Sequence, residues 1–159
     1  QNVDFNNLDV EFHIYGDGNE KNKIENYLKQ NPRSNIYYHG SISKKELYEK
    51  LPYFHTSIIP LKTRIYGAVP SKIFETASLG IPVLFCGGGE GAELVNKYNL
   101  GISSPPGDYK KLTENIRLLK EMEKDQFWDL KKQCYETAQK EFNFEKQLNK
   151  LNQKLKSIT

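Results

Sequence analysis

Short apolar segments alternate along the chain with longer stretches in which apolar residues recur every three or four positions. The apolar segments predict β-strands at 9–15, 36–40, 56–61, 82–86 and 100–102. The longer stretches predict helices at 20–30, from 43, at 70–79, around 92–98 and from 108. Strands that alternate with helices in this way are typical of an α/β fold with a Rossmann-like parallel sheet flanked by helices.

The chain becomes a polar helical sequence from Lys124 onward, so we expect a Rossmann-like domain at 1–123 and C-terminal helices at 124–159. One apolar stripe at helical spacing contains Phe127, Leu130 and Cys134, and a second contains Leu148, Leu151, Leu155 and Ile158. The second stripe could dock on its own domain or on a copy of itself, and an orphaned terminal helix or an uncovered sheet edge could drive a homodimer.

The stretch 66–85 combines a loop, a helix, a helix stop and a buried strand. Pro70 suits the first turn of a helix because its ring fixes φ, and Gly80 and Pro82 end the helix. Ligands of parallel α/β sheets bind at the carboxyl ends of the strands, and the loop before this helix is expected at such an end. The positive end of the helix dipole suits an anionic ligand there, and Lys72 adds a positive charge.

The run 69–75, Val-Pro-Ser-Lys-Ile-Phe-Glu, is followed by Gly-Ile-Pro-Val at 80–83. Together they resemble the donor-site segment of GT-B glycosyltransferases of the retaining family 4 type, in a version found in enzymes of capsular and other surface polysaccharides. That family carries two glutamates separated by seven residues, the second of which binds the ribose of a nucleotide sugar. Glu75 matches the second glutamate, but Gly67 stands at the position of the first.

The resemblance implies a nucleotide-sugar site in which Glu75 binds ribose and the loop before the helix binds the diphosphate. The loop residues are Gly67, Ala68, Val69, Ser71 and Lys72. From the residues alone, Glu75 could instead complement the helix dipole, an effect worth roughly 0.3–1 kcal/mol. Lys72 could be a solvated helix residue, and Ser71 could cap the helix. No catalytic residue is assigned.

Three further glycine-bearing loops also resemble parts of that donor site. The resemblance implies that Gly40, Ser41 and Ile42 contact the nucleobase and that Gly16 belongs to a second-strand loop. It also implies that Gly89 and Glu90, in a loop that begins at Gly87, lie near the donor sugar. Each loop has a simpler interpretation, since a glycine can serve only a tight turn or a flexible connection.

The family's domain normally begins with one more strand, central in the sheet. Residues 1–8 are too polar to form it, so we expect the fold without its first strand, or with that strand supplied by a neighbour. The chain begins with Gln1, and Met122 is its only methionine, which predicts a piece of a longer polypeptide. The resemblance implies that the missing N-terminal domain binds the acceptor and that the final helix crosses the interdomain cleft.

Composition excludes several other classes of protein. The 159 residues, 37% of them hydrophobic, suffice for one domain with a core. A mean hydropathy of −0.71 without a long apolar run excludes a transmembrane helix, and no secretory signal is visible. The net charge of +3 is too small to indicate a nucleic acid partner. Cys86 and Cys134 are expected as reduced thiols, as in a cytoplasmic protein.

The sequence contains no pattern of metal ligands or of a covalent nucleophile. His13, His39 and His55 lie in or beside predicted strands without cysteine or carboxylate partners at metal spacing, so we interpret them as ordinary core or edge residues. Asp-x-Asp, P-loop, Gly-x-Ser-x-Gly and Cys-x-x-Cys motifs are absent from the sequence. We therefore expect a donor site that needs no metal and no cofactor, with a nucleotide diphospho-sugar as substrate.

These observations lead to two hypotheses. The first is the donor-binding part of a retaining glycosyltransferase, inactive alone, which acts with its full polypeptide on a glycan or lipid-linked acceptor at the cytoplasmic membrane face. The second is a nucleotide-binding or assembly domain without transferase chemistry. The glycine at position 67 and the missing first strand favour the second hypothesis.

Overall fold

The strands of the computed structural model, which describes residues 2–157, form two separate parallel sheets. One sheet contains β1 and β2, and the other contains β3, β4 and β5 in that order. The chain divides into two compact units, Gln1–Lys50 and Leu51–Thr159, with one sheet in each. The predicted parallel α/β fold is confirmed, but its strands are divided between two sheets.

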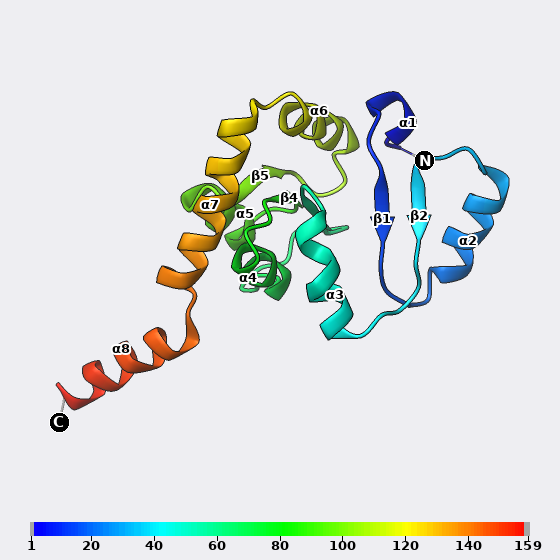
Figure 1. Cartoon of the computed structure of the whole chain (residues 1–159). Coiled ribbons are helices and arrows are strands. Elements are labelled where there is room, and N and C mark those ends of the chain that lie inside the picture. Colours follow the sequence, from blue (N-terminus) through cyan, green and yellow to red (C-terminus); the bar gives the residue numbers. More distant parts are fainter. Residues whose placement is uncertain (1, 158–159) are drawn as a thin grey trace. The chain divides into compact units, whose positions relative to one another are not determined.

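The first unit is built around a β-α-β crossover, in which α2 connects two parallel strands (Figure 1). Phe12 pairs with Ile36 and Ile14 pairs with Tyr38. Its elements are α1 (Phe5–Leu8), β1 (Phe12–Ile14), α2 (Lys21–Gln30), β2 (Ile36–Tyr38) and α3 (Lys44–Lys50). This crossover is the unit that the alternation of apolar and polar residues predicts.

The first strand is shorter than the predicted segment 9–15. Asp4 accepts a hydrogen bond from the N–H of Asn7 and caps α1, a helix that the sequence pattern did not predict. Asp9 then adopts a left-handed conformation with φ 51°, so extended structure begins only after it. Among the described residues before β1, the chain forms this helix and no strand, as expected for a fold without its first strand.

The helix predicted from residue 43 begins with the expected capping box. The N–H of Glu46 donates to the Ser43 hydroxyl at 3.2 Å, and the Glu46 carboxylate accepts from the N–H of Ser43 at 2.9 Å. Hydrogen bonding of the Glu46 carboxylate to the Ser43 side chain and to the Ser43 N–H lowers the pKa of Glu46.

The second unit is a three-stranded sheet between helices. It begins with a 3-10 turn at Leu51–Tyr53, and α4 and α5 lie on one side of the sheet while α6 lies on the other (Figure 1). Its strands are β3 (Ser57–Pro60), β4 (Val83–Cys86) and β5 (Gly101–Ser104). Its helices are α4 (Ser71–Ser78), α5 (Glu90–Lys97), α6 (Tyr109–Lys120), α7 (Lys124–Glu141) and α8 (Phe144–Lys156).

The central strand β4 forms the middle of the core, and all four of its residues are buried. Buried apolar side chains of β3, α4, α5 and α7, and of the residue before β5, belong to the same core cluster: Ile59, Ile73, Ala77, Val95, Leu100, Cys134 and Ala138. Burying a valine, leucine or isoleucine side chain stabilises the folded state by roughly 1.5–3 kcal/mol. The fully apolar run 83–86 explains why this strand, buried on both faces, was predicted with nearly correct bounds.

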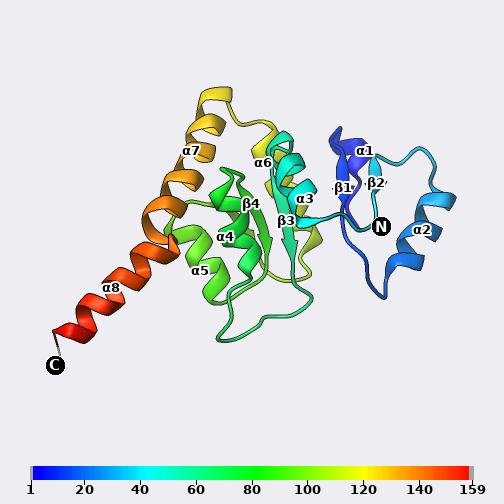
Figure 2. The same ribbon diagram turned by 60° about the horizontal axis from the view of Figure 1, so that its bottom comes forward.

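Helix α7 packs along α4 and closes the core on that side (Figure 2). Gly80, just after α4, has a φ of 66°, and a Cβ at this position would lie 3.2 Å from the backbone oxygen of Lys131. A glycine is therefore needed both to end α4 and to allow the close approach of α7. Leu130 and Cys134, two members of the predicted stripe, are buried.

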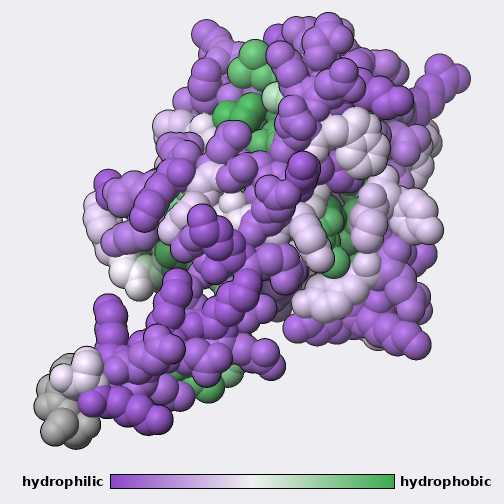
Figure 3. Space-filling view, turned by 60° about the vertical axis from the view of Figure 1, so that its left-hand side comes forward, coloured by the Kyte–Doolittle hydropathy of each residue, from purple (hydrophilic) through white to green (hydrophobic). Residues whose placement is uncertain are grey.

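Helix α8 is exposed along its whole described length. Leu148, Leu151 and Leu155 are each about half exposed, at 44%, 53% and 55%. Figure 3 shows a face of the molecule on which hydrophilic side chains predominate, including those of α8. The fourth member of this predicted stripe, Ile158, lies outside the described residues. The predicted division of the chain at residue 123 stays a prediction.

Candidate functional site

The loop between β3 and α4 follows the carboxyl end of a parallel strand, where the sequence predicted a ligand site. Pro70 is the N-cap of α4, and no described side chain caps the helix. The predicted capping role of Ser71 is therefore wrong, because Ser71 is the first helical residue and its hydroxyl makes no cap hydrogen bond. The N–H of Ile73 donates to the backbone oxygen of Pro70 at 3.1 Å, and no described side chain caps this helix end. A helix N-terminus without a side-chain cap is an arrangement that can bind anions.

The core fixes how α4 presents its polar side chains. Ile73 and Ala77 are buried with 0% and 1% exposure, and they anchor one face of the helix. Lys72 and Ser71 are then exposed, and Glu75 is half-buried one turn further along. The structure therefore brings a cation, a hydroxyl and a carboxylate to one helix end, on the helix that the sequence predicted.

The loop between β4 and α5 meets the loop before α4. The N–H of Gly67 donates to Oε1 of Glu90 at 3.2 Å. Gly89, the N-cap of α5, has φ 69° and ψ −150°, a conformation that is essentially restricted to glycine. The three predicted residues Gly67, Gly89 and Glu90 thus lie together, although 22 and 23 positions separate the first from the other two in sequence.

Arg64 also belongs to this site, although the sequence pattern did not single it out. Its side chain lies over the glycines of the second loop: a Cβ at Gly88 would lie 3.4 Å from its Cγ and Cδ, and one at Gly89 would lie 3.2 Å from its Nε. Its guanidinium also sits 4.7 Å from the ring centroid of Tyr66. The only sequence signal for Arg64 is a cation placed in the loop that precedes the motif.

Electrostatics favour an ionised carboxylate at Glu90. Its own backbone N–H, the N–H of Gly67 and the nearby Arg64 guanidinium lower the pKa of Glu90. The side chain is exposed and lies in the first turn of α5, where the helix dipole also favours a negative charge.

The other predicted residues lie in the first unit, at the carboxyl ends of β1 and β2. The N–H of Gly16 donates to the backbone oxygen of Gly40 at 2.8 Å, and the Tyr38 hydroxyl donates to the backbone oxygen of Gly16 at 2.8 Å. Ser41 is exposed and Ile42 is half-buried. The structure thus brings Gly16 and Gly40 together within this unit. It gives Tyr38 a part in these turns that the sequence did not suggest.

Two of the histidines, predicted as ordinary core or edge residues, face each other in the first unit. Nδ1 of His13 lies 2.9 Å from Nε2 of His39, and the rings of Tyr37 and Tyr15 stack at the two ends of this pair, with centroids 4.8 and 4.4 Å away. Within residues 2–157, no three histidine, cysteine or carboxylate side chains are grouped so that they could hold a metal ion. The predicted metal independence of the site stays a prediction.

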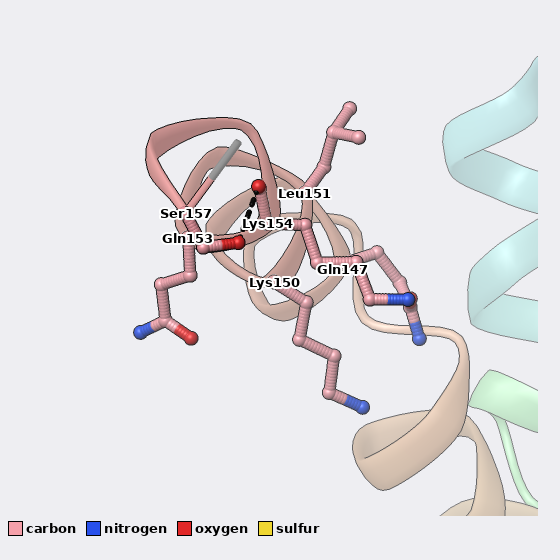
Figure 4. A pocket seen from close by; sticks show the side chains of 6 residues that line it. All are labelled: Gln147, Lys150, Leu151, Gln153, Lys154 and Ser157. Atoms are coloured by element: carbon pink, nitrogen blue, oxygen red, sulfur yellow. Dashed lines mark hydrogen bonds between the residues drawn. The ribbon is translucent and has the colours of Figure 1, made fainter. Parts of the chain in front are cut away.

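A separate pocket lies on the surface of α8 (Figure 4). Its lining comes from this helix and its C-cap alone: Gln147, Lys150, Leu151, Gln153, Lys154 and Ser157. It contains no residue of the predicted site, and one exposed helix face offers no convergent polar groups. Among the described residues, no helix is long and apolar enough to cross a membrane.

Comparisons with known proteins bear on the identity of this fold and site. The sequence profile of the family described as "Glycosyl transferases group 1" matches residues 1–121. The crystal structure of the pneumococcal O-GlcNAc transferase GtfA, in complex with UDP and GlcNAc, is 14% identical, with a TM-score of 0.73. The alignment covers 97% of this chain and 31% of GtfA. No curated protein matches the sequence.

A second solved structure is the apo form of the lipopolysaccharide outer core galactosyltransferase WaaB, 16% identical, with a TM-score of 0.55. This alignment covers 80% of this chain and 37% of WaaB. The chain therefore spans about a third of the length of both structures. At these identities the likeness shows the fold, which is the Rossmann-like fold of GT-B glycosyltransferases. The family profile, which covers more than half of the chain, shows that this chain belongs to the group 1 glycosyl transferases.

Proposed function

We propose that this chain is the donor-binding part of a retaining glycosyltransferase that uses a nucleotide diphospho-sugar. One observation carries the proposal: the N-terminus of α4 has no side-chain cap among the described residues, and it follows an exposed loop at the carboxyl end of β3. A diphosphate would receive hydrogen bonds from the N–H groups there, together with the favourable helix dipole.

The predicted site residues of the loop and of α4 have the following roles in this proposal. The backbone of Gly67, Ala68 and Val69 and the Ser71 hydroxyl approach the diphosphate, and Lys72 neutralises part of its charge. Glu75 accepts hydrogen bonds from the ribose hydroxyls, as its half-buried position one turn into α4 allows. In the first unit, Gly40, Ser41 and Ile42 contact the base, and Gly16 holds the neighbouring turn.

The chemical contribution of these residues is electrostatic. During transfer the bond between the anomeric carbon of the sugar and the diphosphate breaks, and that carbon forms a bond to the acceptor. Positive charge fixed at the departing diphosphate lowers the barrier to this transfer. In the proposal, no metal or cofactor takes part, and the acceptor binds to another domain of a longer polypeptide. The fact that this chain matches only 31% of GtfA and 37% of WaaB supports that division.

The biological setting is part of the same proposal. The Pro-Ser-Lys version of the motif, at 70–72, supports an enzyme of capsular or other surface polysaccharide synthesis, with a glycan or lipid-linked acceptor. Such an enzyme would work in the cytoplasm, at the inner face of the membrane. This chain alone would bind donor without transferring sugar, and an efficient transfer reaction by it would contradict the division of labour.

One observation favours a second candidate, a nucleotide-binding or assembly domain without transferase chemistry. The position that carries a glutamate in the family motif is Gly67, which has no side chain. A full-length polypeptide with transferase activity that depends on Glu75 would exclude this candidate.

Calorimetric titration with UDP, GDP, ADP and CMP tests the proposed function. One nucleotide should bind selectively, and Glu75→Ala should weaken it by about 10- to 100-fold, because a lost hydrogen bond to a charged group costs about 1.5–3 kcal/mol. Glu145→Ala is the matched control, since Glu145 is an exposed glutamate in the first turn of another helix, α8. If neither this chain nor the full-length polypeptide binds any of the four, the proposed function is wrong.

A further inference from the structure

The loop that would bind the diphosphate has little apolar burial to hold it in place. Residues 62–68 are all exposed, and the half-buried residues lie at the two ends of the loop: Leu61 after β3, and Val69 and Pro70 before α4. Segments with few buried contacts are the ones that open most easily in native proteins. A loop of this kind needs specific polar contacts if it is to present its N–H groups in one arrangement.

One such contact comes from Glu90, at the start of α5. Oε1 of Glu90 accepts the N–H of Gly67 at 3.2 Å, near the middle of the loop. Because Gly67 has no side chain, the loop can be held at this point only through its backbone. Gly67 contributes no functional group of its own here. The carboxylate beside position 67 is that of Glu90.

Arg64 provides a second contact between the same two loops. Its side chain lies within 3.4 Å of where a Cβ would project from Gly88 or Gly89, so these glycines leave room for it. Its positive charge is also near enough to favour the ionised form of Glu90. Each segment thus contributes one side chain to the contact. Arg64 of loop 62–68 reaches the loop before α5, and Glu90 of α5 reaches loop 62–68.

We propose that Glu90 is a positioning residue, which fixes loop 62–68 against the start of α5 so that the loop can bind the diphosphate of a nucleotide. This inference rests on the proposed function. Glu90 acts through the N–H of Gly67, and contact between its carboxylate and the ligand is not required.

A simpler role for Glu90 is to complement the dipole of α5, and the chain offers a control for it. Glu93 is also exposed and lies in the first turn of the same helix, yet none of the described contacts connects it to loop 62–68. Glu93 should therefore share the dipole effect and not the positioning effect. Replacing each residue in turn separates the two roles.

The first measurement follows the backbone amide of Gly67 by two-dimensional ¹H–¹⁵N NMR, without nucleotide. In the native protein this amide should titrate with the Glu90 carboxylate, whose pKa is lowered, and its exchange with solvent should be slow relative to its loop neighbours. Glu90→Gln should abolish the titration, whereas Glu93→Gln should leave it unchanged. A Gly67 amide that ignores Glu90→Gln would overturn the proposal.

The second measurement uses the nucleotide among UDP, GDP, ADP and CMP that the native protein binds most tightly. Glu90→Ala should weaken its binding about fivefold or more, Glu93→Ala less than twofold, and Glu90→Gln, which keeps an acceptor oxygen, by an intermediate factor. An unchanged affinity in Glu90→Ala, with the amide titration lost, would overturn the positioning role and leave the proposed function intact. If neither this chain nor the full-length polypeptide binds any of the four, both the proposed function and the positioning role are wrong, and the amide titration would still report whether the contact exists.

Discussion

The ring of Phe142 meets the ring of Phe74 edge-on, with centroids 4.9 Å apart and an interplanar angle of 82°. Phe74 belongs to α4, next to Glu75, and Phe142 is the C-cap of α7. Phe142 makes a similar edge contact with Tyr98, at 5.4 Å. The end of α7 thus joins the helix of the candidate site to the end of α5.

Truncation of Phe142 should destabilise the second unit. Phe142→Ala removes two edge-to-face contacts and leaves a gap among half-buried rings, so the free energy of unfolding should fall by about 2–4 kcal/mol. The matched control is Phe144→Ala, two positions further on, because Phe144 is 77% exposed and its loss should cost less than about 0.5 kcal/mol. Urea unfolding followed by the fluorescence of Trp128 measures both. Equal effects of the two substitutions would contradict this packing.

The two cysteines should be unreactive in the folded protein. Both are free and buried, and burial raises the pKa of the Cys134 thiol to about 12 and also raises the pKa of Cys86. Thiolate is the reactive form, so its fraction at pH 8 is small and reagent access is blocked. A colourless aromatic disulfide reagent should label both thiols only after denaturant is added. Rapid labelling of either thiol in native protein would show that the core opens there.

The pairing of His13 and His39 should make the first unit sensitive to acid. Burial, the charge of His13 and the charge of Lys50 on α3 all lower the pKa of His39 from its usual value of 6.5. The unfolded chain therefore binds the proton more readily, and stability should decrease as the pH falls from 6.5 toward the folded-state pKa. The stabilisation that comes from neutral His39 is complete above pH 6.5, where His39 is neutral in both the folded and the unfolded chain.

Histidine ring-proton NMR measures this effect. The His39 signal should titrate at lower pH in native protein than in urea-unfolded protein. Changing His13 to Gln removes one neighbouring charge and should move the His39 midpoint upward. Trp128 lies in the second unit and serves as a control, because its fluorescence should not follow this titration. A His39 midpoint equal to that of the unfolded chain would contradict the prediction.

Helix α8 should contribute little to the stability of the rest of the chain. All of its described residues are exposed, and its polar contacts with α7 join Lys146 to Gln139 and Gln147 to Glu141. A chain that ends after Phe142 should keep its free energy of unfolding within about 1 kcal/mol, since little apolar surface becomes newly exposed. A much larger loss in a urea titration would show that α8 covers part of the core.

The sequence predicts the local elements well because their signals are local. The capping box of Ser43 and Glu46 and the buried run at 83–86 depend on residues a few positions apart, and both are confirmed. Helix α1 was missed because a single turn capped by Asp4 has no periodic pattern of apolar residues.

The parts of the candidate site that come from distant segments could not be predicted in the same way. The contact between Gly67 and Glu90, like the position of Arg64 over Gly88, depends on which loops follow neighbouring strands of one sheet. No spacing of residue types records such a contact. The family motif placed Gly67 and Glu90 in the site, but only the fold shows that they touch.

Mapping nucleotide binding onto the backbone amides of the whole chain tests the proposed donor site most directly. At 18.4 kDa the protein suits two-dimensional ¹H–¹⁵N NMR, with UDP, GDP, ADP and CMP added in turn. One nucleotide should shift the amides of residues 67–75 most strongly in the second unit, and those of 40–42 in the first. Shifts confined to α8, or spread without preference over the lysine-bearing helices, would contradict a donor site at the start of α4.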